Sequence, residues 1–299
     1  MRVFFPSYYK EFRCIADRCR HSCCVGWEIF VDEGAMARFS ATGGALGDEI
    51  RKNITPDGMI RLTERERCPF LDERGLCRMI SEKGDSFVPA ICQEHPRFYH
   101  RVGDRLEGGI GMSCEEAARI ILSSEDFFSM VELDREIEAA DETDFDTLTH
   151  RKLIYSVLAD ESLDFSARVK RIREEYSIPD PKAEPLRWRD ALSSLEYLNE
   201  ENAELFSVGR SEKCIENYKY LTRFLAYLVL RHVSIADSRD NLRARVGFSL
   251  LLTAILEDML SERELSFDGI CESARRISEE IEYSEDNTAS LIFEFEARI

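Results

Sequence analysis

Residues 14–24 read CIADRCRHSCC, which places four cysteines within eleven residues. Four more cysteines follow within the first 114 residues, at Cys68, Cys77, Cys92 and Cys114. Thiols this close in sequence usually share a metal or pair as disulfides. We therefore expect this part of the chain to be organised around its cysteines, with ligand bonds replacing part of an apolar core.

The spacing of the first cluster, x4, then x3, then two adjacent cysteines, follows no standard metal motif. It matches neither the paired C-x2-C of zinc ribbons nor the C-x2-C-x2-C-x3-C run of ferredoxins. Soft thiolate ligands favour zinc or an iron–sulfur cluster over magnesium or calcium, and the residues alone do not decide between the first two. His21 and His95 lie near cysteines, but a single histidine is more often a structural residue.

The charge of the chain is uneven. The formal net charge is −18; residues 1–122 hold 18 Lys and Arg against 19 Asp and Glu, whereas residues 123–299 hold 22 against 39. Such an acidic chain is repelled by nucleic acid and by anionic lipid, so we expect neither as a partner. The difference between the two halves also argues for two structural units.

The sequence offers neither a secretion signal nor a membrane span. The N-terminal residues lack the long apolar region and the small-residue cleavage site of a signal peptide. The most apolar stretch, 220–233, is interrupted by Arg223, Arg231 and His232, whereas a span needs about 20 apolar residues. We expect a cytoplasmic protein, and in that reducing compartment clustered cysteines favour metal over disulfides.

The predicted fold is mainly α. Residues 1–122 are irregular and glycine-rich, with short strands expected at 28–32 and 59–62, and they form a cysteine-rich metal-binding domain with little β structure. Residues 123–299 form an acidic all-α domain, and its helix near 217–233 should be central because it is apolar on most faces. The helical patterns, which begin after a capping box at Ser113 and Glu116, cover 127–139, 146–176, 190–207, 212–235, 239–260, 262–283 and 286–297.

Several motifs together resemble a known family. PSYYKEFRCI at 6–15 precedes the cysteine cluster and Gly26-Trp27, and CPFL at 68–71 precedes Gly75-Leu-Cys77. Further matches are Cys92-x3-Pro96-Arg97, Ser113-Cys114-x2-Ala117-Ala118-Arg119 and Glu216-Asn217-Tyr218. The chain resembles the flagellin lysine-N-methylase family, and its N-terminal part resembles the wider CxxCxxCC family of zinc- or iron-chelating proteins.

The resemblance implies methyl transfer from S-adenosylmethionine to lysine ε-amines of flagellin or of another lysine-bearing protein. The cofactor expected beside S-adenosylmethionine is an iron–sulfur cluster, 4Fe–4S as the first choice, or zinc. The candidate metal ligands are the eight N-terminal cysteines: Cys14, Cys19, Cys23, Cys24, Cys68, Cys77, Cys92 and Cys114. Cys214 and Cys271 lie on helical patterns and are expected to be buried small hydrophobes. No catalytic residue is assigned; Glu94 and Glu107 are candidate bases only through their proximity to the cysteines.

The residues near the cysteines offer part of the required chemistry. An aromatic channel would lower the pKa of a substrate lysine by desolvation, and ring faces would attract the donor's sulfonium. The rings that could form it, or simply form a core, are Tyr8, Tyr9, Phe12, Trp27, Phe98 and Tyr99. A conventional donor site needs a glycine-rich turn within an alternating β/α pattern. The glycines at 103, 108, 109 and 111 lack that pattern, so we expect them to serve turns.

Two other functions stay open at this point. A non-enzymatic protein could store, sense or deliver zinc or iron through the same cysteines. Alternatively, a structural zinc could hold the cysteine-rich part together while the acidic helices bind a basic partner protein, with charge attraction increasing the rate of encounter.

Overall fold

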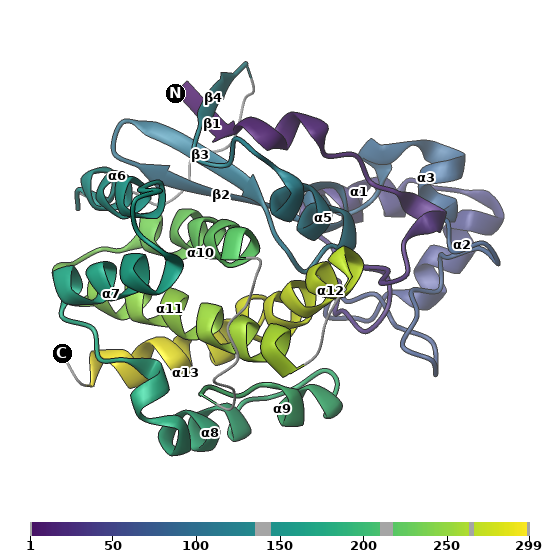
Figure 1. The fold of residues 1–299 in the computed structure, drawn as a ribbon. Helices are drawn as coiled ribbons and strands as arrows, with labels where there is room; N and C mark the ends of the chain where they lie inside the picture. The colour runs from purple at the N-terminus through teal and green to yellow at the C-terminus, as the bar shows by residue number, and fades with distance from the viewer. Residues whose placement is uncertain (1, 135–144, 210–217, 263–265, 298–299) are drawn as a thin grey trace. The chain divides into compact units, whose positions relative to one another are not determined.

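The computed structural model describes residues 2–134, 145–209, 218–262 and 266–297 (Figure 1). The chain divides into two compact units. We name Arg13–Arg97 the cysteine unit, and Met1–Phe12 together with Phe98–Ile299 the helical unit. The motif residues Glu216 and Asn217, and Cys214, lie outside the described residues.

The two compact units do not meet at residue 123, where the cysteine content and the charge of the sequence change. Residues 98–122 supply apolar side chains such as Ile110, Met112 and Ile121 to the core of the helical unit. Their glycine content makes them similar to the cysteine-rich segment in sequence, although they pack with downstream helices. A domain boundary at residues 122 and 123 stays a prediction.

The helical unit contains a four-stranded sheet with the order β2-β3-β1-β4. Its strands are β1 (Arg2–Pro6), β2 (Arg97–Val102), β3 (Arg105–Ile110) and β4 (Met130–Leu133). Strand β1 runs parallel to β3 and antiparallel to β4, and Val3 is in register with both Leu106 and Leu133. Val3, Phe5 and Leu106 form a small apolar cluster on this sheet.

Strand β4 corrects the helix predicted for residues 127–139 and the all-α character predicted for 123–299. Met130–Leu133 pair with Val3–Pro6 of β1. Pairing with a strand distant in sequence thus overrides the helical pattern of the local sequence. Residues 135–139 of that predicted helix lie outside the described residues.

Two of the glycines expected in turns lie in strand β3 instead. Gly103, with φ of +60°, does serve the turn between β2 and β3. A Cβ atom on Gly108 would collide with the rings of Phe5 and Tyr99, and one on Gly109 would collide with Phe98. Here glycine is required because aromatic rings pack directly against the strand backbone.

The rest of the helical unit is helical, which confirms the mainly α prediction (Figure 1). Its helices are α5 (Glu115–Ser123), α6 (Thr147–Leu158), α7 (Phe165–Tyr176), α8 (Pro185–Ser193), α9 (Glu201–Leu205), α10 (Tyr218–His232), α11 (Arg239–Glu262), α12 (Phe267–Ile277) and α13 (Glu285–Glu296). Short 3-10 turns lie at Ser7–Glu11, Pro181–Ala183 and Val233–Ile235, and a π-helical turn, Ser278–Glu282, extends α12.

Helix α10 is central, as its apolar pattern predicts. Ten of its 15 residues are buried, and it packs against α5, α6 and α11, while α13 lies along α11. The single helical pattern at 146–176 is two helices, because Asp164 caps α7 by accepting a hydrogen bond of 2.7 Å from the backbone N of Ala167. The predicted capping box is wrong, since Cys114 and not Ser113 is the N-cap of α5.

The cysteine unit is built from short helices and turns. Its helices are α1 (Glu33–Ser40), α2 (Gly44–Asn53), α3 (Arg78–Lys83) and α4 (Ala90–Glu94), with 3-10 turns at Ala16–Arg18 and Asp85–Phe87. The strands predicted at 28–32 and 59–62 are reduced to single bridges, Phe30 to Met59 and Ile54 to Ile60. Its core holds Phe39, Ile50 and Phe70, all less than 2% exposed.

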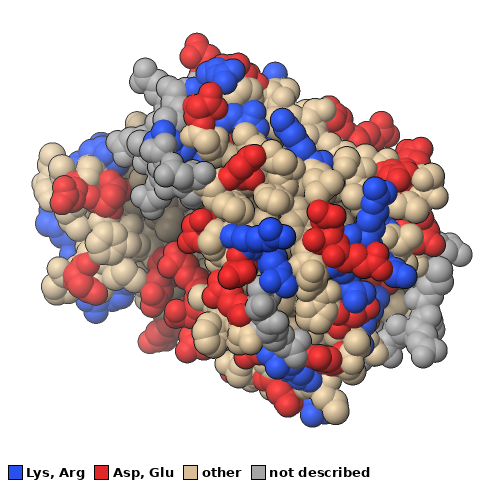
Figure 2. All heavy atoms as spheres, turned by 90° about the vertical axis from the view of Figure 1, so that its left-hand side faces the viewer, with Lys and Arg blue, Asp and Glu red and all other residues tan. Residues whose placement is uncertain are grey.

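The described surface and helices bear on the expected partners. Figure 2 shows one face on which acidic and basic side chains are interspersed with uncharged ones, so the acidic excess does not form one continuous patch there. None of the helices in the described ranges combines the length and apolarity that a bilayer crossing requires.

Candidate metal centre

Four cysteines from three separate segments meet in the core of the cysteine unit. Cys68 is buried there, and Cys24, Cys77 and Cys92 pack partly buried against the same apolar cluster. The backbone N of Cys68 donates a hydrogen bond of 2.8 Å to the carbonyl oxygen of Cys24. All four are free thiols. The sequence-predicted set therefore contains a subset of four that folding brings together.

A tight turn returns the chain from Cys68 to Cys77. The Asp72 carboxylate accepts hydrogen bonds from the backbone N atoms of Arg74 and Leu76, each 2.9 Å long. Gly75 adopts φ of +82°, which favours glycine. Leu71 and Cys77 then form an antiparallel bridge. The CPFL motif and the Gly75-Leu-Cys77 motif thus act as one structural element that places two thiols near each other.

Asp32 fixes the segment that carries Cys92. Its Oδ1 accepts a hydrogen bond of 2.9 Å from the backbone N of Ala35 and caps α1, while its Oδ2 accepts one of 2.7 Å from the backbone N of Ala90. These hydrogen bonds lower the pKa of Asp32 below its usual range. Because Ala90 begins α4, the position of Cys92 is tied to the start of α1.

The electrostatics of the four thiols show that they are close neighbours. Burial, with added repulsion from the neighbouring Cys24 and Cys77, raises the pKa of Cys68 to about 12. Burial likewise raises the pKa of Cys92 to about 12, with added repulsion from the other three thiols. Burial also raises the pKa of Cys77. One buried and two partly buried thiols that would repel one another as thiolates form a site that a bound cation would stabilise.

Cys24 differs from the other three. A hydrogen bond with Cys23 lowers its pKa to about 7, and the Ser22 hydroxyl and the charge of Arg67 act in the same direction against the effect of burial. Cys23 thus favours the thiolate form of Cys24, the form that binds a metal.

The donor set fits a soft metal, although its atoms are not arranged as a finished site. Within the ranges that the structure describes, no three Cys, His, Asp or Glu side chains form a group that could already hold a metal ion. Four thiols with an apolar surround are nevertheless the ligand chemistry of structural zinc and of iron–sulfur clusters. Metal binding would require the side chains to turn towards a common point.

The remaining candidate ligands have other surroundings. Cys14 is exposed, and the Cys19 thiol donates a hydrogen bond of 3.3 Å to the carbonyl oxygen of His21. Cys114 belongs to the helical unit, as the N-cap of α5. Cys271 is buried in α12, which confirms the prediction of a small hydrophobe for that cysteine.

The aromatic residues proposed for a channel mostly serve cores. Tyr8 and Phe12 are buried in the main core of the helical unit. Phe5 stacks on Tyr9 with ring centroids 4.0 Å apart. In the cysteine unit, Trp27 lies edge-on to His95 with ring centroids 5.9 Å apart. These contacts use the rings to build the fold.

Glu107 is a buried ion-pair partner, which removes it as a candidate base. Its side chain is fully buried in β3, and Arg151 of α6 donates two hydrogen bonds to it. Arg105 adds an ion pair of 2.5 Å. Burial alone would raise the pKa of Glu107, but hydrogen bonds from Arg151 and His100 and the charges of both arginines hold it well below its usual range. A carboxylate held in this way does not accept a proton near neutral pH.

A second buried carboxylate lies in the same unit and has no signal in the sequence. Glu282 accepts a hydrogen bond of 2.7 Å from Nε2 of His232 and lies 3.5 Å from Nε of Arg231. The Tyr227 hydroxyl donates to it at 3.3 Å. Sequence reasoning missed this cluster because its members come from α10 and the π-helical turn, 50 residues apart or more.

The comparisons with known proteins bear on the cysteine-rich part. Residues 13–121 match the family model CxxCxxCC, described as "Putative zinc- or iron-chelating domain". Over these residues the chain is similar to that family. They include the four gathered thiols and the turn that places two of them. The match supports metal binding by these residues, as the clustering of the thiols predicts.

Curated relatives support the resemblance to lysine-N-methylases. The chain is 28% identical over 136 residues to the "Lysine-N-methylase" of Salmonella typhimurium and to that of Salmonella choleraesuis; the match covers 42% of this chain and 34% of each relative. It is also 28% identical to the "Flagellar biosynthetic protein FliU" of Salmonella muenchen, of which it covers 80%. The match thus spans about a third of the length of the two methylases. No solved structure matches the chain.

Proposed function

We propose that this protein transfers methyl groups from S-adenosylmethionine to lysine ε-amines of flagellin or of another lysine-bearing protein. The names of the curated relatives support the reaction and a flagellar substrate.

The observation that carries metal dependence is the gathering of four thiols in one apolar core. We propose Cys24, Cys68, Cys77 and Cys92 as the main ligands. The other proposed ligands, for the same site or a second one, are Cys14, Cys19, Cys23 and Cys114. Bound there, a 4Fe–4S cluster would supply redox chemistry and an iron centre, whereas zinc would supply a structural or Lewis-acidic charge.

The proposed reaction balances as a displacement at carbon. The neutral lysine nitrogen attacks the methyl carbon of the sulfonium, and the carbon–sulfur bond breaks with its electron pair remaining on sulfur. The new alkylammonium then loses a proton to solvent. The protein must hold the amine neutral and in line with the breaking bond.

The test combines full-length, metal-replete protein with flagellin and S-adenosylmethionine that carries an isotope-labelled methyl group. Mass spectrometry should show labelled methyl groups on lysine side chains of flagellin. Cys68→Ser and Cys92→Ser should abolish the transfer. Cys271→Ser, a buried cysteine of the helical unit, should retain it. Unchanged flagellin in the presence of folded, metal-loaded protein would rule out the proposed reaction.

The metal itself is tested by anaerobic purification, metal analysis and an ultraviolet–visible spectrum. About four irons and four sulfides per cluster, with a brown colour, support the iron–sulfur assignment. A colourless protein with zinc supports the second choice. The free thiols at the four central positions fit a reducing compartment, so we also propose a cytoplasmic location.

A non-enzymatic metal-binding protein is the second candidate. It is supported by the family match, which covers a chelating domain and leaves most of the helical unit outside it. In that case the bound metal should exchange with the external supply, and added S-adenosylmethionine should neither bind nor change the protein's spectrum.

A further inference from the structure

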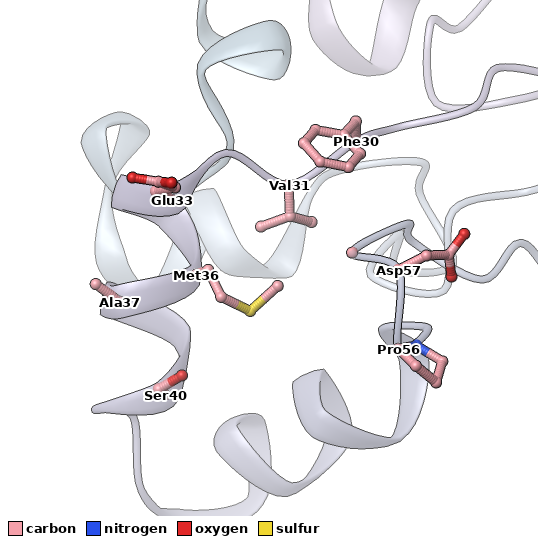
Figure 3. A pocket seen from close by; sticks show the side chains of 9 residues that line it. Phe30, Val31, Glu33, Met36, Ala37, Ser40, Pro56 and Asp57 are labelled. Carbon is pink, nitrogen blue, oxygen red and sulfur yellow. The ribbon is translucent and has the colours of Figure 1, made fainter.

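A shallow, open pocket of about 510 Å³ lies on the cysteine unit beside α1 (Figure 3). One wall is α1 and the other is the loop that follows α2. The side chains of Val31 and Met36 point into the space between these walls, and the ring of Phe30 lies above it. The apolar part of the lining is Phe30, Val31, Met36, Ala37 and Pro56.

The floor of the pocket is fixed by the fold. Val31 is 3% exposed, and its backbone N donates a hydrogen bond of 2.8 Å to the carbonyl oxygen of Gly58. Gly58 has φ of +86°, and any Cβ there would contact the Phe30 ring. A partner would therefore meet a preformed surface and would not have to order it.

Phe30 leaves a large apolar ring in water. It is 59% exposed, although its neighbours Ile29 and Val31 are buried in the core of the unit. Its backbone pairs with Met59 in a single bridge. The ring and the apolar hollow beside it form adjoining apolar surface that a side chain of a partner could bury.

The charge of the lining selects the partner. Glu33 and Asp57 are the charged residues of the lining, and no basic residue lines the pocket. Both are exposed, and Figure 3 shows them on opposite sides of the opening. A hydrogen bond from Thr55 lowers the pKa of Asp57 below its usual range. Two carboxylates around an apolar floor favour a segment with both an apolar and a cationic side chain.

We infer that this pocket docks a lysine-bearing segment of the protein substrate. An apolar side chain of the segment enters between Phe30 and Met36, and a lysine beside it lies against Glu33 or Asp57. The inference rests on the proposed function for its protein substrate. Helix α1 also shares Asp32 with α4, which carries Cys92, so the docked segment would be held on the same unit as the thiols.

The sharpest test changes the charge at Ala37, an exposed lining residue on α1. Ala37→Lys and Ala37→Glu have similar length and both suit a helix. The probe is a fluorescent peptide with a leucine flanked by two lysines, and affinity is measured by anisotropy with the full chain in the absence of S-adenosylmethionine. Ala37→Lys should weaken binding and Ala37→Glu should strengthen it, each roughly threefold to fivefold, as exposed charge pairs contribute up to about 1 kcal/mol.

Matched variants separate the pocket from the general surface charge. Glu33→Gln with Asp57→Asn should weaken binding and its salt dependence. Glu64→Gln with Glu73→Gln removes two exposed acids of the same unit outside the lining and should leave binding unchanged. Phe30→Ala should also weaken binding. A matching peptide with two glutamates in place of the lysines should bind most weakly to the wild-type chain.

The outcomes distinguish this inference from the proposed function. Peptide binding that follows the charge at residue 37, without methyl transfer to flagellin, supports the pocket and contradicts the reaction. Methyl transfer with a KM for flagellin that is the same in both Ala37 variants overturns the pocket and keeps the reaction. A change of oligomeric state in sedimentation, caused by Phe30→Ala, would show that a second copy of the chain occupies the pocket and would also overturn the inference.

Discussion

The cysteine unit and the helical unit hold themselves together in different ways. In the helical unit, the 24-residue helix α11 and helix α10 contribute to one large core, which includes Trp188 and Phe248, both fully buried. In the cysteine unit, the longest helix has 10 residues, too short to be stable alone, and its small core includes thiols. The smaller apolar core of the cysteine unit supports our proposal that a bound metal contributes to its stability.

The two units also differ in how they bury charge. The helical unit buries Glu107 and Glu282 together with arginine and histidine partners. In the cysteine unit, burial raises the pKa of Cys68, Cys77 and Cys92 more than neighbouring groups lower it. A bound metal would have the role there that arginine has in the helical unit.

The largest expected effect is the loss of the cysteine unit on metal removal. Structural zinc contributes about 10–16 kcal/mol to the folding of small zinc domains, far more than the core of this unit can replace. A strong chelator should therefore unfold residues 13–97 and leave α10 and α11 folded. Hydrogen exchange with mass spectrometry should show lost protection in α1–α4 alone. Protection unchanged in α1–α4 after complete metal removal would contradict the comparison.

The sequence predicts features that depend on neighbouring residues better than features that depend on partners distant in sequence. The apolar pattern of residues 217–233 predicts a central helix, because a helix with apolar residues on most faces must be buried and this can be read from neighbouring residues alone. The sequence names Cys68 and Cys77 as candidate ligands but does not say which thiols share a site. The approach of Cys68 to Cys24 depends on a backbone hydrogen bond across more than forty residues. Strand β4 and the Glu282 cluster were missed for the same reason, since both depend on partners distant in sequence.

The second prediction removes one partner of the buried pair in the helical unit. Arg151→Met leaves the negative charge of Glu107 buried without its main ion-pair partner and should lower the free energy of unfolding by about 3–5 kcal/mol. Urea unfolding followed by circular dichroism measures the loss. The double variant Glu107→Leu with Arg151→Met should recover most of it, because an apolar pair replaces the ion pair. A single variant as stable as the wild type would show that this cluster is not part of what holds the unit together.

The third prediction concerns pH. Burial lowers the pKa of His100, against the opposing effect of Glu107, and it lowers the pKa of His232, against that of Glu282; Arg231 adds to the lowering at both. In the unfolded chain each titrates near 6.5, so below that pH the unfolded state binds more protons than the folded one. The stabilisation is therefore complete above about pH 6.5 and falls with decreasing pH, by up to about 1.4 kcal/mol per pH unit for each histidine.

Urea unfolding between pH 7 and pH 5 measures this slope, in a range above the titration of ordinary carboxylates. His100→Gln with His232→Gln should flatten it, because glutamine binds no proton in either state. A slope equal in the wild type and the double variant would assign the pH dependence to other groups.

The smallest expected effect tests whether surface ion pairs could hold the cysteine unit in place of a metal. Arg51 and Asp48 form an ion pair of 2.6 Å on α2, with side chains 50% and 79% exposed. Water screens such a pair, and pairs three residues apart on a helix contribute about 0.5 kcal/mol or less. Asp48→Asn should therefore change the melting of the metal-loaded protein by no more than this amount, and less still at high salt. A loss comparable to that caused by chelation would mean that surface charges organise the unit, and the role assigned to the thiols would have to be given up.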